Sequence, residues 1–284
     1  MKSGKISAKK IRRGKTGQCL LLLSVVIFTI CSIRLGAVCL KYRAAEHEYR
    51  EIAAIAVPDD VPEIAPVAIP ESGARIPEIN GVLAPAIDFK KLSALNSDLV
   101  GWIEIPALEI SYPVVQAHDN DTYLNQTFNG GDNSAGCIFM DFRNASELTD
   151  RNTILYGHNM KNGAMFGKLK NYREKETAEM GAVFFYSTPV TAFLCEVISC
   201  RTVSASDEEY PIQFNDNEEF MEYTEKIRRE SLQTFETAVS EDDRLITLST
   251  CCGKDAVRFV VQARVSAQNT SCQTTGVHQT AAPY

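Results

Sequence analysis

Short runs rich in β-branched and aliphatic residues, separated by turn residues, recur along the chain between residues 101 and 265. Runs of this length and composition predict β-strands. We expect strands at 101–105, 110–116, 136–142, 153–156, 183–187, 190–203, 245–250 and 257–265. About eight short strands with few helices are typical of a closed barrel or of a sandwich, and the periodicity does not choose between the two. The predicted fold class is therefore mainly β.

A few helices and one tight turn are expected around these strands. Asp88 is a typical N-cap for a short helix at 89–96, and a second short helix is expected around 165–172. A longer amphipathic helix near 218–235 would place Phe220, Tyr223 and Ile227 on one face. The sequence Asn-Gly-Gly-Asp at 129–132 predicts a hairpin turn and not a phosphate-binding loop.

The N-terminal segment has the pattern of a membrane anchor. Residues 2–15 carry seven lysines and arginines, and residues 19–40 are apolar except for Arg34 and a few small hydroxyl residues. A helix of this length measures roughly 33 Å and crosses a hydrocarbon core of about 30 Å. The basic tail, 1–18, would lie in the cytoplasm and the rest of the chain outside. The alternative is a cleaved signal peptide, but no Ala-x-Ala site follows the run and Arg34 would lie inside the cleavage region.

The segment after the anchor is expected to connect it to a globular domain. Residues 41–56 contain helix formers and mixed charge, which predicts a short juxtamembrane helix. Residues 57–85 hold six of the eleven prolines and predict a semi-rigid, extended spacer. We therefore expect a juxtamembrane helix and Pro-rich linker at 41–86, a globular domain at 87–266 and a polar C-terminal tail at 267–284.

The charge of the chain is distributed unevenly. The formal net charge is −7, but residues 1–43 carry ten basic and no acidic residues, and the remainder carries 19 basic and 36 acidic residues. An acidic main domain argues against a nucleic-acid partner. It also argues against adhesion of this domain to an anionic membrane surface.

A cysteine, a histidine and an arginine stand where predicted strands meet loops. Cys251 ends one strand and Arg258 begins the next, so pairing of the two strands would bring a thiol close to a guanidinium group, which favours a reactive thiolate. A thiol nucleophile also needs a proton donor or base, most often histidine. His158 follows the run at 153–156 and occupies the same kind of strand end. The other histidines lie in segments predicted to be helix, turn or tail: His47, His118 and His278.

The segments around these three residues resemble the sortase family. They are Thr-Ile-Leu-Tyr-Gly-His-Asn-Met at 153–160, Thr-Leu-Ser-Thr-Cys at 247–251 and Arg-Phe-Val-Val at 258–261. Flanking segments at 101–106, 112–116 and 136–144 are similar to those of class B sortases in particular. The resemblance covers residues 88–265 and implies the eight-stranded sortase β-barrel with peripheral helices, preceded by the transmembrane helix.

The resemblance also implies a cysteine transpeptidase, a thiol protease that transfers an acyl group. Cys251 would be the nucleophile, His158 the general acid and base, and Arg258 the donor to the oxyanion or the substrate backbone. Asn120 and Ser249 match positions near the substrate groove of the family. The expected substrate is a surface protein or pilin with a sorting signal of the Asn-Pro-x-Thr-x type, which is cleaved after threonine. The expected acceptor is an amine on a peptidoglycan precursor or pilin, outside the membrane of a Gram-positive-type cell.

Several alternatives stay open at this point. The chain would be a sortase-like hydrolase if water accepted the acyl group, or a surface protein that keeps the barrel and only binds peptides. Arg264 has the same strand parity as Arg258, and the loop after Cys251 is shorter than in some class B members. Cys252 is either a tolerated small side chain or an oxidation partner of Cys251.

The nine cysteines do not predict a metal site. No Cys or His spacing suggests zinc, and the acidic residues between 119 and 132 lack an ordered calcium-ligand pattern. We therefore expect no metal and no cofactor. Outside the cell, a disulfide from Cys137 to Cys195 or Cys200 is compatible with the sequence, which does not give the connectivity.

Overall fold

The computed structural model describes residues 15–57, 78–79, 82–204, 210–251, 257–265 and 270–271. The chain divides into two compact units, Met1–Ala44 and Ala45–Tyr284. Helix α1 (Lys15–Ala56) is continuous, so one helix covers both the expected anchor and the expected juxtamembrane helix. The apolar part of α1 has exposed side chains and is long and apolar enough to cross a membrane, a test that a signal sequence also passes.

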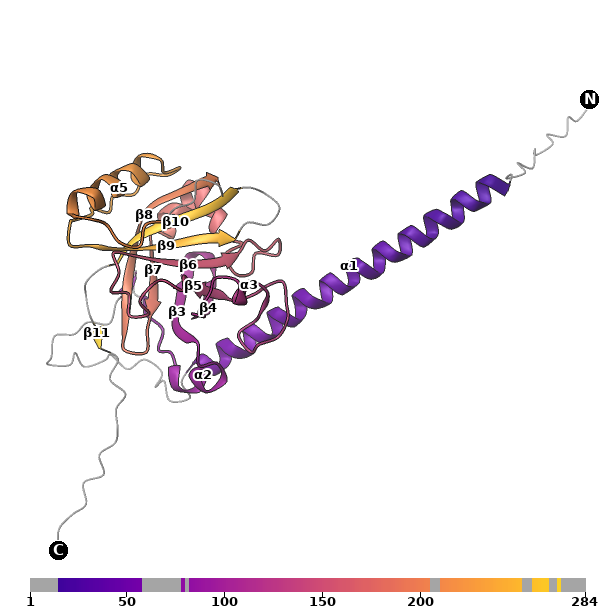
Figure 1. Ribbon diagram of the computed structural model, residues 1–284, viewed down its shortest axis with the longest axis horizontal. Helices are drawn as coiled ribbons and strands as arrows, with labels where there is room; N and C mark the ends of the chain where they lie inside the picture. Colours follow the sequence, from indigo (N-terminus) through magenta and orange to yellow (C-terminus); the bar gives the residue numbers. More distant parts are fainter. Residues whose placement is uncertain are drawn as a thin grey trace, which may run out of the picture. The chain divides into compact units, whose positions relative to one another are not determined.

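The second unit is built around a closed β-barrel (Figure 1). Its strands follow the order β10-β9-β6-β5-β4-β3-β7-β8, and β8 pairs back with β10, which closes the ring and confirms the eight-stranded barrel. The strands are β3 (Leu99–Ile105), β4 (Ile110–Val115), β5 (Ile138–Met140), β6 (Asn152–His158), β7 (Val183–Ser187), β8 (Thr191–Ser204), β9 (Arg244–Cys251) and β10 (Val257–Val265).

Two of the pairings in the ring are parallel, and the others are antiparallel. The parallel pairs are β4 with β5 and β6 with β9. The two predicted strands that flank residues 252–256, β9 and β10, pair antiparallel as expected. Three further two-residue strands lie outside the ring: β1 (Glu78–Ile79), which pairs with β2 (Val82–Leu83), and β11 (Thr270–Ser271), which pairs with β8.

Helix α5 (Asn217–Arg229) covers one side of the barrel with the apolar face that the sequence predicted. Asp216 caps its N-terminus by accepting a hydrogen bond from the backbone N–H of Glu219. Phe220 and Ile227 are buried against the wall in one hydrophobic cluster. The helix ends earlier than expected, because the chain turns after Arg229 and the backbone N–H of residue 232 bonds to a carbonyl of β8.

The short helices agree with the sequence in one place and differ in another. Helix α2 (Phe89–Leu95) begins after Asp88, whose carboxylate accepts from the N–H of Lys91 as an N-cap. The helix expected at 165–172 is wrong: Met165 has a positive φ of 52° and only a 3-10 turn, η2 (Leu169–Arg173), forms there. The cause is that this loop folds back on β6, where the N–H of Phe166 bonds to the carbonyl of His158. The other short elements are η1 (Pro106–Leu108), α3 (Thr122–Asn125) and α4 (Lys175–Met180).

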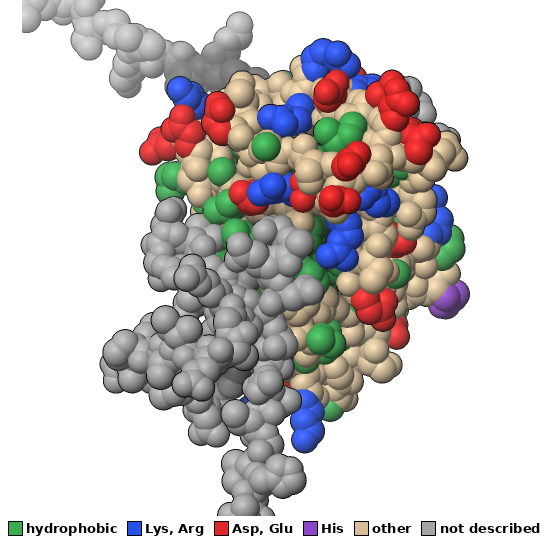
Figure 2. Space-filling view, turned by 90° about the vertical axis from the view of Figure 1, so that its left-hand side faces the viewer, with side chains coloured by type: hydrophobic (Ala, Val, Ile, Leu, Met, Phe, Trp, Pro, Cys, Tyr) green, Lys and Arg blue, Asp and Glu red, His purple; other side chains and the backbone are tan. Residues whose placement is uncertain are grey.

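The surface on the side that carries α5 has mixed charge. Figure 2 shows acidic and basic side chains interspersed on this face, with a few apolar side chains between them. Helix α5 itself has acidic residues in its first turn and basic residues in its last turn, which suits the helix dipole.

Candidate active site

Strands β6 and β9 run parallel and end side by side at the same edge of the barrel. Their register runs from the pair Asn152 and Leu245 to the pair His158 and Cys251. Each of the last two residues ends its strand, and neighbouring strands lie about 4.8 Å apart. The backbone positions of His158 and Cys251 are therefore direct neighbours. These are the two residues that the sequence predicted as acid and nucleophile.

The imidazole of His158 is half-buried and is held by a backbone carbonyl. Its Nε2 lies 2.6 Å from the carbonyl oxygen of Leu124, in α3. A carbonyl oxygen only accepts, so Nε2 carries the proton in this arrangement. The start of α3 is fixed by Asp119, whose carboxylate accepts from the N–H groups of Thr122 and Asp121. The hydrogen bond from Thr122, followed by that from Asp121, lowers the pKa of Asp119.

Glycine is the residue that fits immediately before the histidine. A β-carbon at Gly157 would lie 2.4 Å from Cδ1 of Ile138 and 2.7 Å from Cδ2 of Phe166. Phe166 also donates its backbone N–H to the carbonyl of His158 at 3.0 Å. Phe166 therefore packs on the glycine with its ring and tethers the histidine backbone with its own backbone N–H.

Arg258 lies on β10, the strand next to β9. The β9–β10 register runs to the pair Ser249 and Val260, and both Cys251 and Arg258 lie two residues beyond that pair on their strands. The guanidinium carbon of Arg258 is 5.9 Å from the ring centre of Tyr156 on β6, within the distance of a cation–π contact. Position 258 is therefore at the same end of the barrel wall as positions 158 and 251, while Cys252 lies outside the described residues.

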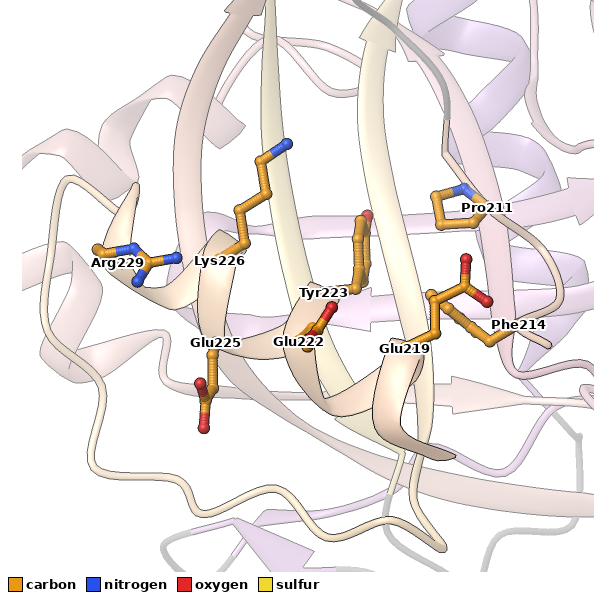
Figure 3. A pocket seen from close by; sticks show the side chains of 8 residues that line it. All are labelled: Pro211, Phe214, Glu219, Glu222, Tyr223, Glu225, Lys226 and Arg229. Carbon is orange, nitrogen blue, oxygen red and sulfur yellow. The ribbon is translucent and has the colours of Figure 1, made fainter. Parts of the chain in front are cut away.

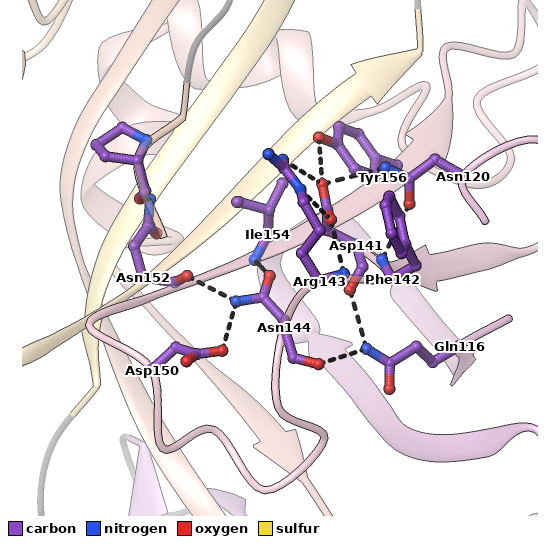
Figure 4. Close-up of polar contacts among 11 residues, drawn as sticks. Gln116, Asn120, Asp141, Phe142, Arg143, Asn144, Asp150, Asn152, Ile154 and Tyr156 are labelled. Atoms are coloured by element: carbon purple, nitrogen blue, oxygen red, sulfur yellow. Dashed lines mark hydrogen bonds and ion pairs between the residues drawn. The ribbon is translucent and has the colours of Figure 1, made fainter. Parts of the chain in front are cut away.

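A buried carboxylate that the sequence analysis did not single out lies next to this site. Asp141 is fully buried, and its Oδ2 accepts from the hydroxyl of Tyr156 at 3.1 Å and from Nδ2 of Asn120 at 3.1 Å (Figure 4). Arg143 donates to both carboxylate oxygens, at 2.9 and 2.8 Å. Burial raises the pKa of Asp141, but the hydrogen bonds from Arg143 outweigh it, so the pKa lies below its usual range. The sequence signal for this residue is the segment 136–144, which is similar to that of class B sortases.

Asn120 and Ser249, the two residues expected near a substrate groove, both hold protein groups. The Oδ1 of Asn120 accepts from the backbone N–H of Phe142 at 3.1 Å, so its amide clamps the segment after β5. Ser249 is fully buried, and its hydroxyl lies 3.0 Å from the hydroxyl of Tyr210. Tyr210 belongs to a hydrophobic cluster with Ile154 on this part of the wall.

Three further cysteines of the second unit are buried, and the second arginine of β10 is held in ion pairs. Cys137, Cys195 and Cys200 are buried free thiols. Burial raises the pKa of each of these thiols, that of Cys137 to about 12. Arg264, the arginine most easily confused with Arg258, forms ion pairs with Glu196 and Asp243.

A hollow of about 480 Å³ lies beside α5 (Figure 3). Pro211, Phe214 and Tyr223 line it together with charged side chains of α5. None of the five predicted site residues contributes to its lining. Within the described ranges, no group of three or more His, Cys, Asp or Glu residues is arranged to hold a metal ion.

Comparison with known proteins agrees with the motifs and the barrel. The model of the sortase domain family matches residues 103–266. Sortase B of Listeria monocytogenes is 36% identical over 181 residues, which cover 63% of this chain and 74% of that protein. Sortase B of Staphylococcus aureus is 31% identical over 180 residues, which cover 62% of this chain and 74% of that protein.

Solved structures show the same likeness. A crystal structure of sortase B from B. anthracis has a TM-score of 0.65 and 33% identity, and the match covers 80% of this chain and 98% of that chain. A Staphylococcus aureus sortase B–substrate complex has a TM-score of 0.61 and 30% identity, and the match covers 63% of this chain and 84% of that chain.

Proposed function

We propose, from the premise that this chain belongs to the sortase family and within it to class B, that it cleaves an Asn-Pro-x-Thr-x sorting signal after threonine and transfers the acyl group to an amine. Members of this family are cysteine transpeptidases that act on proteins with sorting signals. The observation that carries the proposal is the register of the parallel strands, which pairs His158 with Cys251. Arg258 follows at the start of the adjacent strand.

The first half of the proposed reaction forms a thioester. The thiolate of Cys251 attacks the carbonyl carbon of the threonine, and the carbonyl electrons move to its oxygen. When the tetrahedral intermediate collapses, the carbon–nitrogen bond to the following residue breaks. The imidazolium of His158 gives its proton to the departing amine. Because Nε2 donates to the Leu124 carbonyl, the proton that reaches the amine would come from Nδ1, the other ring nitrogen.

The second half transfers the acyl group. An incoming amine attacks the thioester carbon, the neutral imidazole of His158 accepts the proton of that amine, and the carbon–sulfur bond breaks to return the Cys251 thiolate. Water in place of the amine would give the free acid and make the protein a hydrolase. Arg258 donates hydrogen bonds to the oxyanion in both halves, where a fixed charge in a half-buried position is effective.

The other predicted residues act on this site through the protein groups that they hold. We assign Asn120 to shaping the groove wall, because its amide ties Asp141 and the segment after β5 to the loop before α3. Ser249 acts through the hydroxyl of Tyr210, which it meets at 3.0 Å. Asp141 fixes the hydroxyl of Tyr156, whose ring lies against Arg258.

The apolar helix suggests membrane anchoring, and we propose a single-pass topology. Residues 19–40 would cross the membrane, with the basic tail in the cytoplasm and the catalytic domain at 87–266 outside. The juxtamembrane helix and Pro-rich linker at 41–86 would precede that domain, with the helix packed on it from Ala45 onward, and the tail at 267–284 would follow it. The substrates would be surface proteins or pilins, and the acceptor would be an amine on a peptidoglycan precursor or pilin lysine.

The test uses the full-length chain in detergent micelles with a library of Asn-Pro-x-Thr-x peptides, with and without triglycine as the amine acceptor. Mass spectrometry should find cleavage after threonine and a triglycine-linked product, and Cys251→Ala should abolish both. Arg258→Ala should also lose activity, whereas Arg264→Ala, a matched arginine of the same strand, should retain it. Free acid alone in the presence of triglycine would favour the hydrolase. Saturable binding without any cleavage would favour the peptide-binding protein.

A further inference from the structure

The C-terminal part of α1 presents one buried face to the barrel. Ala45, Tyr49, Ile52 and Ala56 are 4%, 6%, 1% and 1% exposed, and their spacing of four, three and four residues places them on one stripe of a helix. The backbone N–H of Asp88, at the start of α2, donates to the carbonyl of Ala56 at 2.9 Å. This part of α1 is thus an integral element of the second unit, and the contacts of Tyr49 lead from it toward the predicted histidine.

One chain of contacts from Tyr49 ends at the carbonyl that holds His158. The hydroxyl of Tyr49 donates to the carbonyl oxygen of Gly136 at 2.6 Å. Gly136 has a φ of 59°, and a β-carbon there would lie 2.7 Å from the carbonyl oxygen of Leu124. The backbone of Gly136 therefore packs directly on the group that accepts the hydrogen bond of Nε2 of His158.

A second chain of contacts reaches the other side of the same histidine. The rings of Tyr49 and Tyr112 meet edge to face, with centres 5.4 Å apart. The hydroxyl of Tyr112 accepts from the backbone N–H of Met165 at 3.3 Å. Met165 forms a β-bridge with Asn159, the residue after His158. Tyr49 thus contacts Gly136 and Tyr112, and each of these residues contacts one of the two segments next to His158.

We propose that Tyr49 is a positioning residue and that the C-terminal part of α1 holds His158 in its working orientation, which rests on the catalytic role proposed above for that histidine. Burial raises the pKa of Tyr49 well above its usual value, so its hydroxyl stays protonated and keeps donating to Gly136. Loss of this hydroxyl releases the Gly136 carbonyl, and the Leu124 carbonyl behind it loses its fixed position. The imidazole then samples orientations that do not serve proton transfer.

The test compares Tyr49→Phe with Tyr172→Phe in the full-length chain. Tyr172 is the matched control, because its buried hydroxyl also donates to a glycine carbonyl at 2.6 Å, that of Gly181. Among the residues that the structure describes, no contact of this hydroxyl leads to Leu124. With the best-cleaved peptide of the library and triglycine, Tyr49→Phe should lower kcat about 10-fold, since misplacement by a fraction of an ångström is costly in catalysis. Its KM should stay within about twofold, because substrate contacts are unchanged. Tyr172→Phe should retain the wild-type kcat.

An NMR measurement on histidine-labelled protein tests the link between Tyr49 and His158 without an activity assay. The Nε2 proton of His158 should exchange slowly with water in the wild type and in Tyr172→Phe, and quickly in Tyr49→Phe. If the Nε2 proton still exchanged slowly in folded Tyr49→Phe, the proposal would be overturned. This result does not depend on peptide cleavage, so it is distinct from a failure of the proposed function, in which no variant would cleave any peptide. If Tyr49→Phe did not fold, Tyr112→Phe would replace it, and slow exchange in that variant would overturn the proposal.

Discussion

Two fully buried tyrosines of the second unit should respond oppositely to loss of their hydroxyl groups. Tyr172 donates its hydroxyl to the carbonyl of Gly181 at 2.6 Å, and Tyr186 has a buried hydroxyl that meets no hydrogen-bond partner in the described part of the chain. Replacing each by phenylalanine removes one oxygen and keeps the ring. We expect Tyr186→Phe to raise the free energy of unfolding and Tyr172→Phe to lower it.

The magnitudes follow from what each oxygen does in the fold. A buried hydroxyl without a partner costs about 1–3 kcal/mol of desolvation, so its removal from Tyr186 should stabilise the fold by about 1 kcal/mol. Removing the hydroxyl of Tyr172 loses one hydrogen bond and strands a buried carbonyl, which costs about 1–2 kcal/mol. In a domain of this size, 1 kcal/mol corresponds to roughly 2–4 °C in Tm. The two variants should therefore differ in Tm by about 4–12 °C.

Tryptophan fluorescence is a direct assay for this difference. Trp102 is the only tryptophan of the chain, and it is buried in β3 of the barrel wall. Its emission during thermal or urea unfolding reports the barrel itself. Equal destabilisation in Tyr172→Phe and Tyr186→Phe would refute the reasoning, because it would mean that the Tyr186 hydroxyl has a partner.

A glycine next to Tyr186 provides an independent check on the same reasoning. A β-carbon at Gly101 would lie 2.2 Å from the hydroxyl oxygen of Tyr186 and 2.9 Å from the carbonyl oxygen of Ser187. Overpacking of this kind costs about 1–3 kcal/mol, so Gly101→Ala should be destabilising. Because the hydroxyl makes the closest of these contacts, Tyr186→Phe should recover part of the loss in the double variant. Strict additivity of the two changes would contradict this placement.

Three further predictions concern the network, the glycine before the histidine and a buried thiol. Because hydrogen bonds from Arg143 outweigh burial and depress the pKa of Asp141, its stabilising charge is present above about pH 4 and is lost as the pH falls through the folded-state pKa. Urea titrations should therefore show that Asp141→Asn is about 1–3 kcal/mol less stable than the wild type at pH 7, and that this difference is smaller at pH 3. An equal difference at both pH values would contradict a charged Asp141 that stabilises the fold. Gly157→Ala should lose about 1–3 kcal/mol and slow peptide cleavage, because its methyl group would displace Phe166; a wild-type Tm would contradict this. Burial raises the pKa of Cys195, so mass spectrometry should find its thiol alkylated by iodoacetamide only in urea, and labelling of the native protein would contradict its burial.

The strands were predictable because each is a short apolar run bounded by turn residues. All eight expected strands are present, and their bounds shift by only a few residues. Closure of the barrel was not predictable from periodicity, because it depends on the pairing of β8 with β10, which are separated by α5 and β9. The expected helix at 165–172 failed for a related reason: local propensity was overridden by backbone bonds to β6, among them that of Phe166.

The predicted catalytic residues came from motifs, whereas their supports came only from the structure. His158, Cys251 and Arg258 stand in recognisable segments, and their roles stay predictions. Leu124 holds the imidazole of His158 through its backbone carbonyl. A sequence motif shows side chains, so it does not reveal this contact. Ser249 matched a groove position in sequence, but it is fully buried and its hydroxyl meets that of Tyr210, 39 residues away in the chain. Asp141 is an ordinary residue after a strand end until Asn120 and Tyr156, from two other segments, and the nearby Arg143 converge on its carboxylate.

The parallel pairing of β6 and β9 explains why a histidine and a cysteine so far apart in sequence form one site. In a parallel pair both chains leave the sheet at the same edge, so the last residues of the two strands are neighbours. Side chains alternate between the two faces of a strand, so a shift of one residue in either strand would turn one member of the pair to the opposite face. Gly157 and Phe166 oppose such a shift in β6, because the glycine fits only where it now lies against the ring. The register of this one strand pair therefore determines whether the proposed acid faces the proposed nucleophile.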